Sequence, residues 1–311
     1  MSKLKGLLLT EGMHGMISQV EGLAKALGID YIHQKVELNK FTKFIPPKIT
    51  PVSDLFFKKF DIPEIDIIIS CGRKSVIPSI YLKRKLKRKI INIHIQDPKV
   101  SPANFDYIIV PEHDGLKGDN VITSKGAIHY LTIDEIKENH NYLINKLKQD
   151  KQYLLLILGG PNKYYDFQEK NLLNIFKKIK KVITEYDLQA IIIPSIRTPN
   201  KTISLAQNFF DKENLVISGV DKKAYLSGLS LAKYIIVTCD STSMISEAAI
   251  TGKPIYVAEI QPKRDDYRFK QFRDLFIRLN IIRIFEHKLE TWEYEKLDET
   301  QKIAEKIKNK L

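Results

Sequence analysis

The stretch that decides the fold is YIIVTCDSTSMISEAAITGKPIYVAE, residues 234–259. Apolar residues 234–237 predict a buried strand, the polar residues up to Ser243 predict a loop, and a short helical pattern then runs to Gly252 as its C-cap. A second apolar run follows. The stretch is therefore a strand–helix–strand unit, and its polar loop belongs at the carboxyl edge of a parallel sheet, where such sheets bind ligands.

This polar loop has two interpretations. Ser241, Thr242 and Ser243 offer hydroxyls and free backbone N–H groups ahead of the helix, which suit a phosphate at a helix N-terminus. Glu247, one turn further on, would then reach a ribose hydroxyl. Alternatively, the serines only cap the helix, and Glu247 is a solvated acid of its first turn. The stretch by itself leaves both interpretations open.

Length and cysteine content set the class of protein. The chain has 311 residues, about twice a typical domain, and its hydrophobic content of 43% is enough for a folded core. Two cysteines, Cys71 and Cys239, fit a reducing compartment better than a disulfide framework. The apolar run near the N-terminus is too short for a signal peptide, and no stretch approaches the ~18 apolar residues of a membrane span. We expect a cytoplasmic protein.

The net charge is +13, from 50 basic and 37 acidic residues, and indicates anionic partners. A lysine-rich composition without function gives the same excess. The basic run 83–89 is either a solvated helix end or an anchor to an anionic membrane, which would make the protein peripheral on the inner face of the plasma membrane. Nucleic acid is not an expected partner, because interleaved aromatic and basic residues are missing from the sequence.

Aromatic residues gather in the loosely patterned segment 36–60. We expect them to pack on the domain, and contact with a membrane is the alternative. They are Phe41, Phe44, Phe56 and Phe57.

Strand and helix patterns alternate along the whole chain, which predicts two doubly wound, Rossmann-like α/β domains with a cleft between them. The boundary is expected at 148/149, which gives domains 1–148 and 149–311, and the last helix is free to pack back on the first domain. We predict strands at 4–9, 66–70, 90–95, 107–110, 153–158 and 189–193, and helices at 17–27, 132–149 and 167–182.

Two loops at predicted strand ends of the first domain carry candidate catalytic residues. His14 lies between two glycines after the first strand and has the pKa range of a general base, although it is equally a loop histidine without a task. Glu112, His113 and Asp114 follow the strand at 107–110 and could supply a base or a ligand. Their spacing is not that of a metal site, so no metal is predicted.

Two corresponding loops of the second domain suit an anion. Gly159 and Gly160 follow its first strand and allow the backbone to approach a diphosphate closely, with Asn162 and Lys163 in the same loop. Arg197 follows the next strand and is a suitable phosphate partner.

Over nearly its full length the chain resembles the "elongated mitochondria" mitochondrial-fission family, whose bacterial members are regarded as glycosyltransferases. The resemblance rests on residues 11–19 and on several long segments in the same order. These are SCGRKS (70–75), QDP (96–98), PEHDGLKGDNV (111–121), GGPNK (159–163), SIRTP (195–199) and VTCDSTSMISEAAITGKP (237–254).

The last segment also resembles the donor-binding loop of GT-B glycosyltransferases such as the lipid II enzyme. That resemblance implies a nucleotide-sugar donor, no metal or separate cofactor, and an acceptor that enters over the loop of His14. It places Gly159 and Gly160 near the diphosphate, Ser241 to Ser243 near the diphosphate and sugar, and Glu247 near the ribose. Asp240, in the same loop, is counted among the donor-binding residues, although it departs from the pattern, since many such enzymes have a small residue there.

The expected function is transfer of a sugar from a nucleotide diphosphate to a cell-envelope acceptor such as a lipid-linked core saccharide. Two alternatives remain. One is a non-enzymatic membrane-surface adaptor that recruits a fission or division protein, and the other is a nucleotide-sugar epimerase, which would act on the donor without an acceptor.

Overall fold

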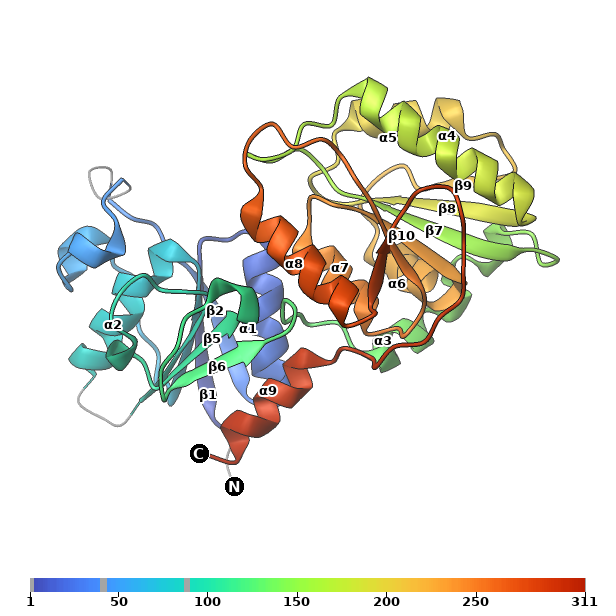
Figure 1. The fold of residues 1–311 in the computed structure, drawn as a ribbon. Helices are drawn as coiled ribbons and strands as arrows, with labels where there is room; N and C mark the ends of the chain where they lie inside the picture. Colours follow the sequence, from blue (N-terminus) through green and yellow to red (C-terminus); the bar gives the residue numbers. More distant parts are fainter. Residues whose placement is uncertain (1–2, 40–43, 87–89, 311) are drawn as a thin grey trace. The chain divides into compact units, whose positions relative to one another are not determined.

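The computed structural model describes residues 3–39, 44–86 and 90–310 (Figure 1). The chain packs as two units: Met1–Tyr130 together with Asp298–Leu311, and Leu131–Leu297. This division differs from the predicted 148/149 boundary, because residues 131–148 pack against a helix of the second unit. The C-terminal helix packs in the first unit, as the prediction allowed.

The first unit contains, in its described residues, a six-stranded sheet with the order β2-β1-β3-β4-β5-β6. All its strand pairs are parallel. Its strands are β1 (Lys5–Thr10), β2 (Asp30–Lys35), β3 (Ile67–Cys71), β4 (Ile91–Ile95), β5 (Tyr107–Pro111) and β6 (Val121–Ser124), and its helices are α1 (His14–Leu27), α2 (Val76–Lys85) and α9 (Glu299–Lys308).

Alternating side chains of these strands enter apolar clusters on the two faces of the sheet. Leu8 of β1 lies in one cluster with Leu23 of α1 and Ile307 of α9, whereas Leu7 and Leu9 lie in another with Leu82 of α2. The strands of a parallel sheet covered on both faces read as continuous apolar runs, and that is why they were predictable.

The second unit contains, in its described residues, a six-stranded parallel sheet with the order β12-β11-β10-β7-β8-β9. Helices α4 and α5 lie on one face, and α6 and α7 on the other (Figure 1). Its strands are β7 (Gln152–Leu158), β8 (Leu188–Pro194), β9 (Leu215–Val216), β10 (Tyr234–Thr238), β11 (Ile255–Ala258) and β12 (Ile282–Ile284), and its helices are α3 (Ile133–Glu138), α4 (Glu169–Glu185), α5 (Asn200–Phe209), α6 (Lys222–Leu231), α7 (Thr242–Ala249) and α8 (Tyr267–Arg278).

Each sheet has one point where the strand order reverses direction. In the first unit it lies between β1 and β3, and in the second between β7 and β10. Chains leaving the carboxyl ends of the strands at such a point diverge to opposite faces, which opens a crevice where doubly wound folds bind ligands. Candidate site residues should therefore follow β1, β3, β7 and β10.

Two helix predictions were wrong in extent. Helix α1 begins at His14 rather than at residue 17, because the Met13 carbonyl already accepts from the N–H groups of Met16 and Ile17. The helix predicted at 132–149 ends at Glu138 and continues as 3₁₀ turns. There the Ser227 hydroxyl donates to the His140 carbonyl (2.8 Å) and accepts from the Leu143 N–H (3.1 Å), which diverts backbone groups from a helical ladder.

Candidate functional site

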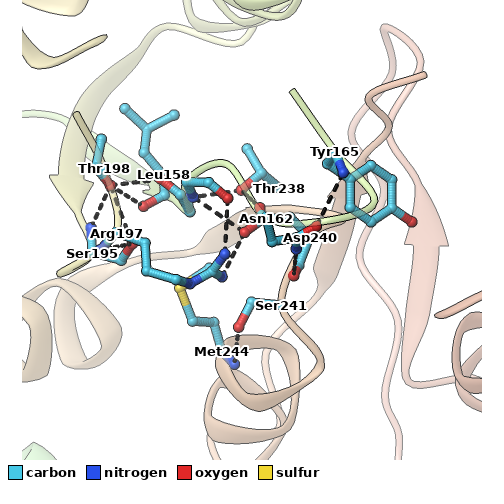
Figure 2. Close-up of polar contacts among 12 residues, drawn as sticks. Leu158, Asn162, Tyr165, Ser195, Arg197, Thr198, Thr238, Asp240, Ser241 and Met244 are labelled. Carbon is cyan, nitrogen blue, oxygen red and sulfur yellow. Dashed lines mark hydrogen bonds and ion pairs between the residues drawn. The ribbon is translucent and has the colours of Figure 1, made fainter. Parts of the chain in front are cut away.

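The densest polar network of the predicted site lies at the reversal point of the second sheet (Figure 2). It joins the loops after β7, β8 and β10. Thus Gly160, Arg197 and Asp240, which are far apart in sequence, meet within hydrogen-bonding distance. The structure brings together the three predicted donor loops, and Ser241 to Ser243 follow Asp240 directly in the third of them.

Gly159 and Gly160 are required by internal packing. A Cβ on Gly159 would lie 2.1 Å from Asp240 Oδ1, and one on Gly160 would lie 2.0 Å from the Arg197 carbonyl oxygen. Their N–H groups are also engaged: Gly159 donates to Thr238 Oγ1 (2.8 Å) and Gly160 to Asp240 Oδ2 (3.1 Å). The glycine pair thus allows close approach, as predicted, but what approaches is the chain's own carboxylate and backbone.

Asp240 is the centre of the network. It is 2% exposed, and its carboxylate also accepts from the Thr238 hydroxyl (2.6 Å) and from Arg197 Nη2 (2.6 Å). Burial raises the pKa of the Asp240 carboxyl, against the lowering effects of Arg197, Thr238 and the Gly160 N–H. A buried carboxylate with this many donors is held in one orientation.

Arg197 closes the network on its outer side. Its Nη1 donates to the Gly160 carbonyl (2.8 Å), while 35% of its side chain stays exposed. The loop that carries it is fixed by Thr198, whose hydroxyl donates to the Leu158 and Gly159 carbonyls and accepts from the Ser195 N–H (2.8 Å). Guanidinium has five N–H donors, so two bonds leave donors for an anion on the exposed side.

Asn162 and Lys163 behave differently from each other. Asn162 Nδ2 donates to the Asp240 carbonyl (3.2 Å), and its Oδ1 accepts from the Tyr164 and Tyr165 N–H groups (2.7 and 3.0 Å). Lys163 is exposed, with its ammonium 4.7 Å from the centre of the Tyr164 ring. Asn162 therefore shapes the loop, and Lys163 is accessible to a ligand.

Ser241 is the N-cap of α7, and its hydroxyl accepts from the Met244 N–H at 3.4 Å. Of the two roles that the sequence left open for Ser241, phosphate binding and helix capping, the structure shows the capping role. Thr242 and Ser243 form the first turn of the helix and are half-buried. Their position next to Asp240 puts the positive end of the helix beside the Arg197 network.

Glu247 lies one turn into α7, partly exposed, and accepts a hydrogen bond from the Tyr225 hydroxyl of α6 (2.8 Å). Burial raises the pKa of its carboxyl to about 7, against the lowering effect of the Tyr225 hydrogen bond. Glu247 is therefore not the freely solvated acid of the simpler interpretation.

Sequence reasoning missed a second buried cluster that fixes the loop of Asn162. The Tyr165 hydroxyl donates to Asp266 and accepts from Arg273 Nη1 (3.0 Å), and Arg273 pairs with Asp266 (3.1 Å). Tyr165 is fully buried. The signal available in the sequence was weak, because Tyr165 and Asp266 lie 101 residues apart.

In the first unit, His14 is an exposed residue at the start of α1, with its ring 6.2 Å from that of Tyr130. The expectation of a loop histidine was wrong in this detail, although His14 does follow β1 at the sheet's reversal point. Beside it, sequence reasoning missed Glu11, whose carboxylate accepts from the Lys74 N–H (3.1 Å) and pairs with its ammonium (2.7 Å). This pair spans the loops after β1 and β3.

Glu112, His113 and Asp114 form a 3₁₀ turn after β5. Glu112 is exposed, whereas the side chains of His113 and Asp114 are 8% and 7% exposed and lie 3.7 Å apart. Strands β1 and β5 are separated by two others, so the strands that lead to His14 and to this turn lie roughly 14 Å apart in the same sheet. Across the described residues, no three or more His, Cys, Asp or Glu side chains are arranged so that they could hold a metal ion together.

The basic run and the aromatic segment have mixed outcomes. Lys83 pairs with Asp106, and residues 87–89 lie outside the described part of the chain. Phe57 is buried, as the packing prediction requires, but Phe44 is 87% exposed. Phe56 is half-buried, and Phe41 lies outside the described residues. Among the helices that the structure describes, none is both long and apolar enough to cross a membrane.

Sequence comparison connects this chain to known proteins. The family model described as mitochondrial fission ELM1 matches residues 14–311. An uncharacterized protein of Rickettsia prowazekii is 28% identical over 78% of this chain and 79% of its own length. The mitochondrial fission protein ELM1 of Arabidopsis thaliana is 22% identical over 79% of this chain, and the match spans 64% of the plant protein.

Solved structures show the same fold at low identity. S. aureus MnaA, solved with UDP, has a TM-score of 0.54 at 14% identity and covers 98% of this chain and 88% of its own. Streptomyces nogalater glycosyltransferase SnogD has a TM-score of 0.53 at 11% identity and covers 99% of this chain and 95% of its own. E. coli ADP-heptose heptosyltransferase II has a TM-score of 0.50 at 10% identity and covers 98% of each chain. With the two six-stranded parallel sheets, these likenesses confirm the predicted GT-B-type pair of Rossmann-like domains.

Proposed function

This chain belongs to the mitochondrial fission ELM1 family, and from that premise we propose that it is a glycosyltransferase. It moves a sugar from a nucleoside-diphosphate donor to an acceptor hydroxyl in cell-envelope synthesis. The observation that carries the proposal is Arg197, whose partly exposed guanidinium is held at the reversal point of the second sheet beside the N-terminus of α7. That is the position and charge a leaving diphosphate needs.

The donor is held by the second unit. Arg197, the exposed Lys163 and the first turn of α7 at Ser243 stabilise the charge that develops on the diphosphate as the glycosidic bond breaks. Glu247 accepts a hydrogen bond from a ribose hydroxyl. Relatives of the same fold support this choice, since one was solved with UDP and another is named for ADP-heptose.

The acceptor is bound by the first unit, and His14 deprotonates its hydroxyl. Among the candidate bases, His14 and Glu112 are exposed, while His113 and Asp114 have little access to solvent. His14 also follows β1 at the sheet's reversal point, where Glu112 does not. Histidine is the side chain most often used as a general base near neutral pH.

A lipid-linked acceptor fits an apolar surface on the first unit. Phe44, Ile49 and Leu55 are 87%, 68% and 75% exposed within one short segment. Arg73, in the turn after β3, donates to the Ile45 carbonyl (3.1 Å) and so ties this segment to the reversal point of the sheet. With the net charge of +13, the proposal places the enzyme in the cytoplasm, on the anionic inner face of the plasma membrane.

The membrane contact is tested with vesicles of neutral and of anionic phospholipid. Replacing Phe44, Ile49 and Leu55 together by serine should abolish sedimentation with anionic vesicles and leave thermal stability unchanged. Val220→Ser, at a residue 66% exposed in the second unit, is the matched control and should bind like the wild type. Equal binding of the triple variant would remove the lipid surface from the proposal.

The transferase activity is tested by a calorimetric screen of UDP, GDP, ADP, CMP and their sugars on the wild type and on Glu247→Ala. The nucleotide sugar that binds is then incubated with the enzyme, with and without extracted lipid-linked saccharides. Sugar on the lipid and free nucleotide support the proposal. An isomerised donor without acceptor would make the protein an epimerase, and the absence of any nucleotide binding would favour the non-enzymatic adaptor.

A further inference from the structure

The Gly159–Gly160 loop already contains an anion, the carboxylate of Asp240. It accepts from the Gly160 N–H, the Thr238 hydroxyl and Arg197 Nη2, at 3.1, 2.6 and 2.6 Å. These are the kinds of donor that such loops direct at a phosphate oxygen. The Asp240 side chain is fully buried behind Arg197, which is 35% exposed.

A second observation agrees with this arrangement. The Gly159 N–H is taken by Thr238 Oγ1, and the space in which a Gly159 Cβ would lie is filled by both carboxylate oxygens. A diphosphate oxygen therefore cannot enter between the glycines while Asp240 holds this position. The N–H donors of Arg197 that make no internal bond, and the first turn of α7, are partly exposed to solvent and so remain available to a ligand.

Resting on the proposed function, we infer that Asp240 is a positioning residue for the donor site and does not itself contact the donor. It holds Arg197 and the glycine turn from their buried side, so that the solvent-exposed N–H groups of Arg197 are free to bind the diphosphate. Its negative charge partly cancels the attraction of Arg197 for that diphosphate. The Asp240 carboxylate therefore weakens the binding of the leaving nucleotide, while its hydrogen bond holds the Arg197 guanidinium in one position.

Two substitutions at Asp240 separate its charge from its hydrogen bonds. In Asp240→Asn, the amide carbonyl still accepts from Gly160 and Arg197 and the amide N–H₂ donates to Thr238, but the negative charge is gone. We expect the affinity for inorganic pyrophosphate and for UDP to rise about tenfold, because a like charge close to the ligand has been removed. In Asp240→Ala, Arg197 loses its carboxylate partner and keeps only the bond to the Gly160 carbonyl, and the affinity should fall at least tenfold.

Asp211→Asn is the control, since it removes the same charge from an ion pair with Lys180 in the same unit. It should leave the affinities unchanged. Asp240→Asn should also remove the contribution of this carboxyl, whose pKa is raised by burial, to the pH dependence of wild-type affinity, whereas a merely structural residue would leave that profile in place. Weaker binding in Asp240→Asn, equal to that of Asp240→Ala, would overturn the inference, because Asp240 would then contact the ligand or only hold the fold.

A measurement without ligand tests the contact between Asp240 and Arg197 separately from the proposal that this site binds the donor. Urea unfolding of Asp240→Asn, Arg197→Gln and the double variant should show non-additive effects. Additive effects would overturn the tie between the two residues. If the effects are non-additive but neither the wild type nor any variant binds pyrophosphate or UDP, the contact between Asp240 and Arg197 stands. The donor site and the positioning role of Asp240 are then both rejected.

Discussion

The carboxyl edges of the two sheets differ in how their polar groups are used. At the edge of the second sheet, Asp240 joins three loops in one buried network. At the edge of the first sheet, the polar contacts are separate pairs: Glu11 pairs with Lys74 between the loops after β1 and β3, Asp97 pairs with Lys99 two residues away, and His14 stays in solvent. The second edge is built to hold one fixed arrangement of charge, while the first exposes groups that a substrate can reach. Under the proposed function, the second edge binds the donor and the first edge activates the acceptor.

The largest expected effect breaks the network of the second edge. Gly160→Ala places a Cβ 2.0 Å from a backbone oxygen of Arg197, which the loop cannot avoid without moving. We expect a loss of about 3 kcal/mol in the free energy of unfolding, measured with urea. Gly219→Ala is the matched control, because a Cβ there meets nothing within 4 Å, and it should stay within about 0.5 kcal/mol of the wild type. Similar values for the two variants would contradict a rigid network.

The next effect concerns the first edge and activity alone. Under the proposed function, His14→Ala should lower the rate of sugar transfer by about 100-fold or more, as loss of a general base does, while donor affinity and stability stay the same. His287→Ala, at another exposed histidine, should transfer sugar at the wild-type rate. A normal rate in His14→Ala would direct attention to Glu112.

The third effect is the pH dependence that Glu247 confers on stability. The pKa of its carboxyl is raised from 4.5 to about 7, so the folded protein keeps a proton that the unfolded chain releases. Its contribution is therefore most favourable below pH 4.5 and is lost as the pH rises to about 7. Glu247→Gln should be more stable than the wild type by about 2 kcal/mol at pH 8, with the difference shrinking toward pH 4.5. Glu259→Gln, at an exposed acid, should follow the wild-type curve.

The smallest effect belongs to the Glu11–Lys74 pair of the first edge. The Lys74 side chain is 37% exposed, and Glu11→Gln can keep the hydrogen bond from the Lys74 N–H. We expect a loss of no more than about 1 kcal/mol in the free energy of unfolding. The loss should become smaller in 1 M salt. A larger, salt-independent loss would show that the first edge is as tightly coupled as the second.

Much of the fold could be predicted from the sequence because both sheets are parallel and buried. Strands such as β7 and β10 are continuous apolar runs, and the polar residues at their ends mark the carboxyl edge. The edge strand β2, which lacks such a run, was not predicted. Local patterns also overextended the helix at 132–149, because the hydrogen bonds that end it come from Ser227, far along the chain.

The candidate site was predictable in its members but not in its connections. The loops of Gly159, Arg197 and Asp240 were each recognised from their place after a strand. That Asp240 would fill the glycine turn could not be seen, since the contact joins residues 80 apart in sequence. For the same reason, the close approach to Gly159 and Gly160 was expected of a diphosphate, whereas in the folded chain the Asp240 carboxylate and the Arg197 backbone make it.

The most direct test of the central claim is amide hydrogen exchange in the presence and absence of the nucleotide sugar that the screen identifies. We predict slower exchange in residues 159–165, 195–199 and 239–248, which are the loops after β7, β8 and β10 and the start of α7, as ligand binding stabilises local structure there. Protection confined to other segments of the second unit, or a bound nucleotide that leaves these loops unchanged, would contradict a donor site at this edge of the sheet.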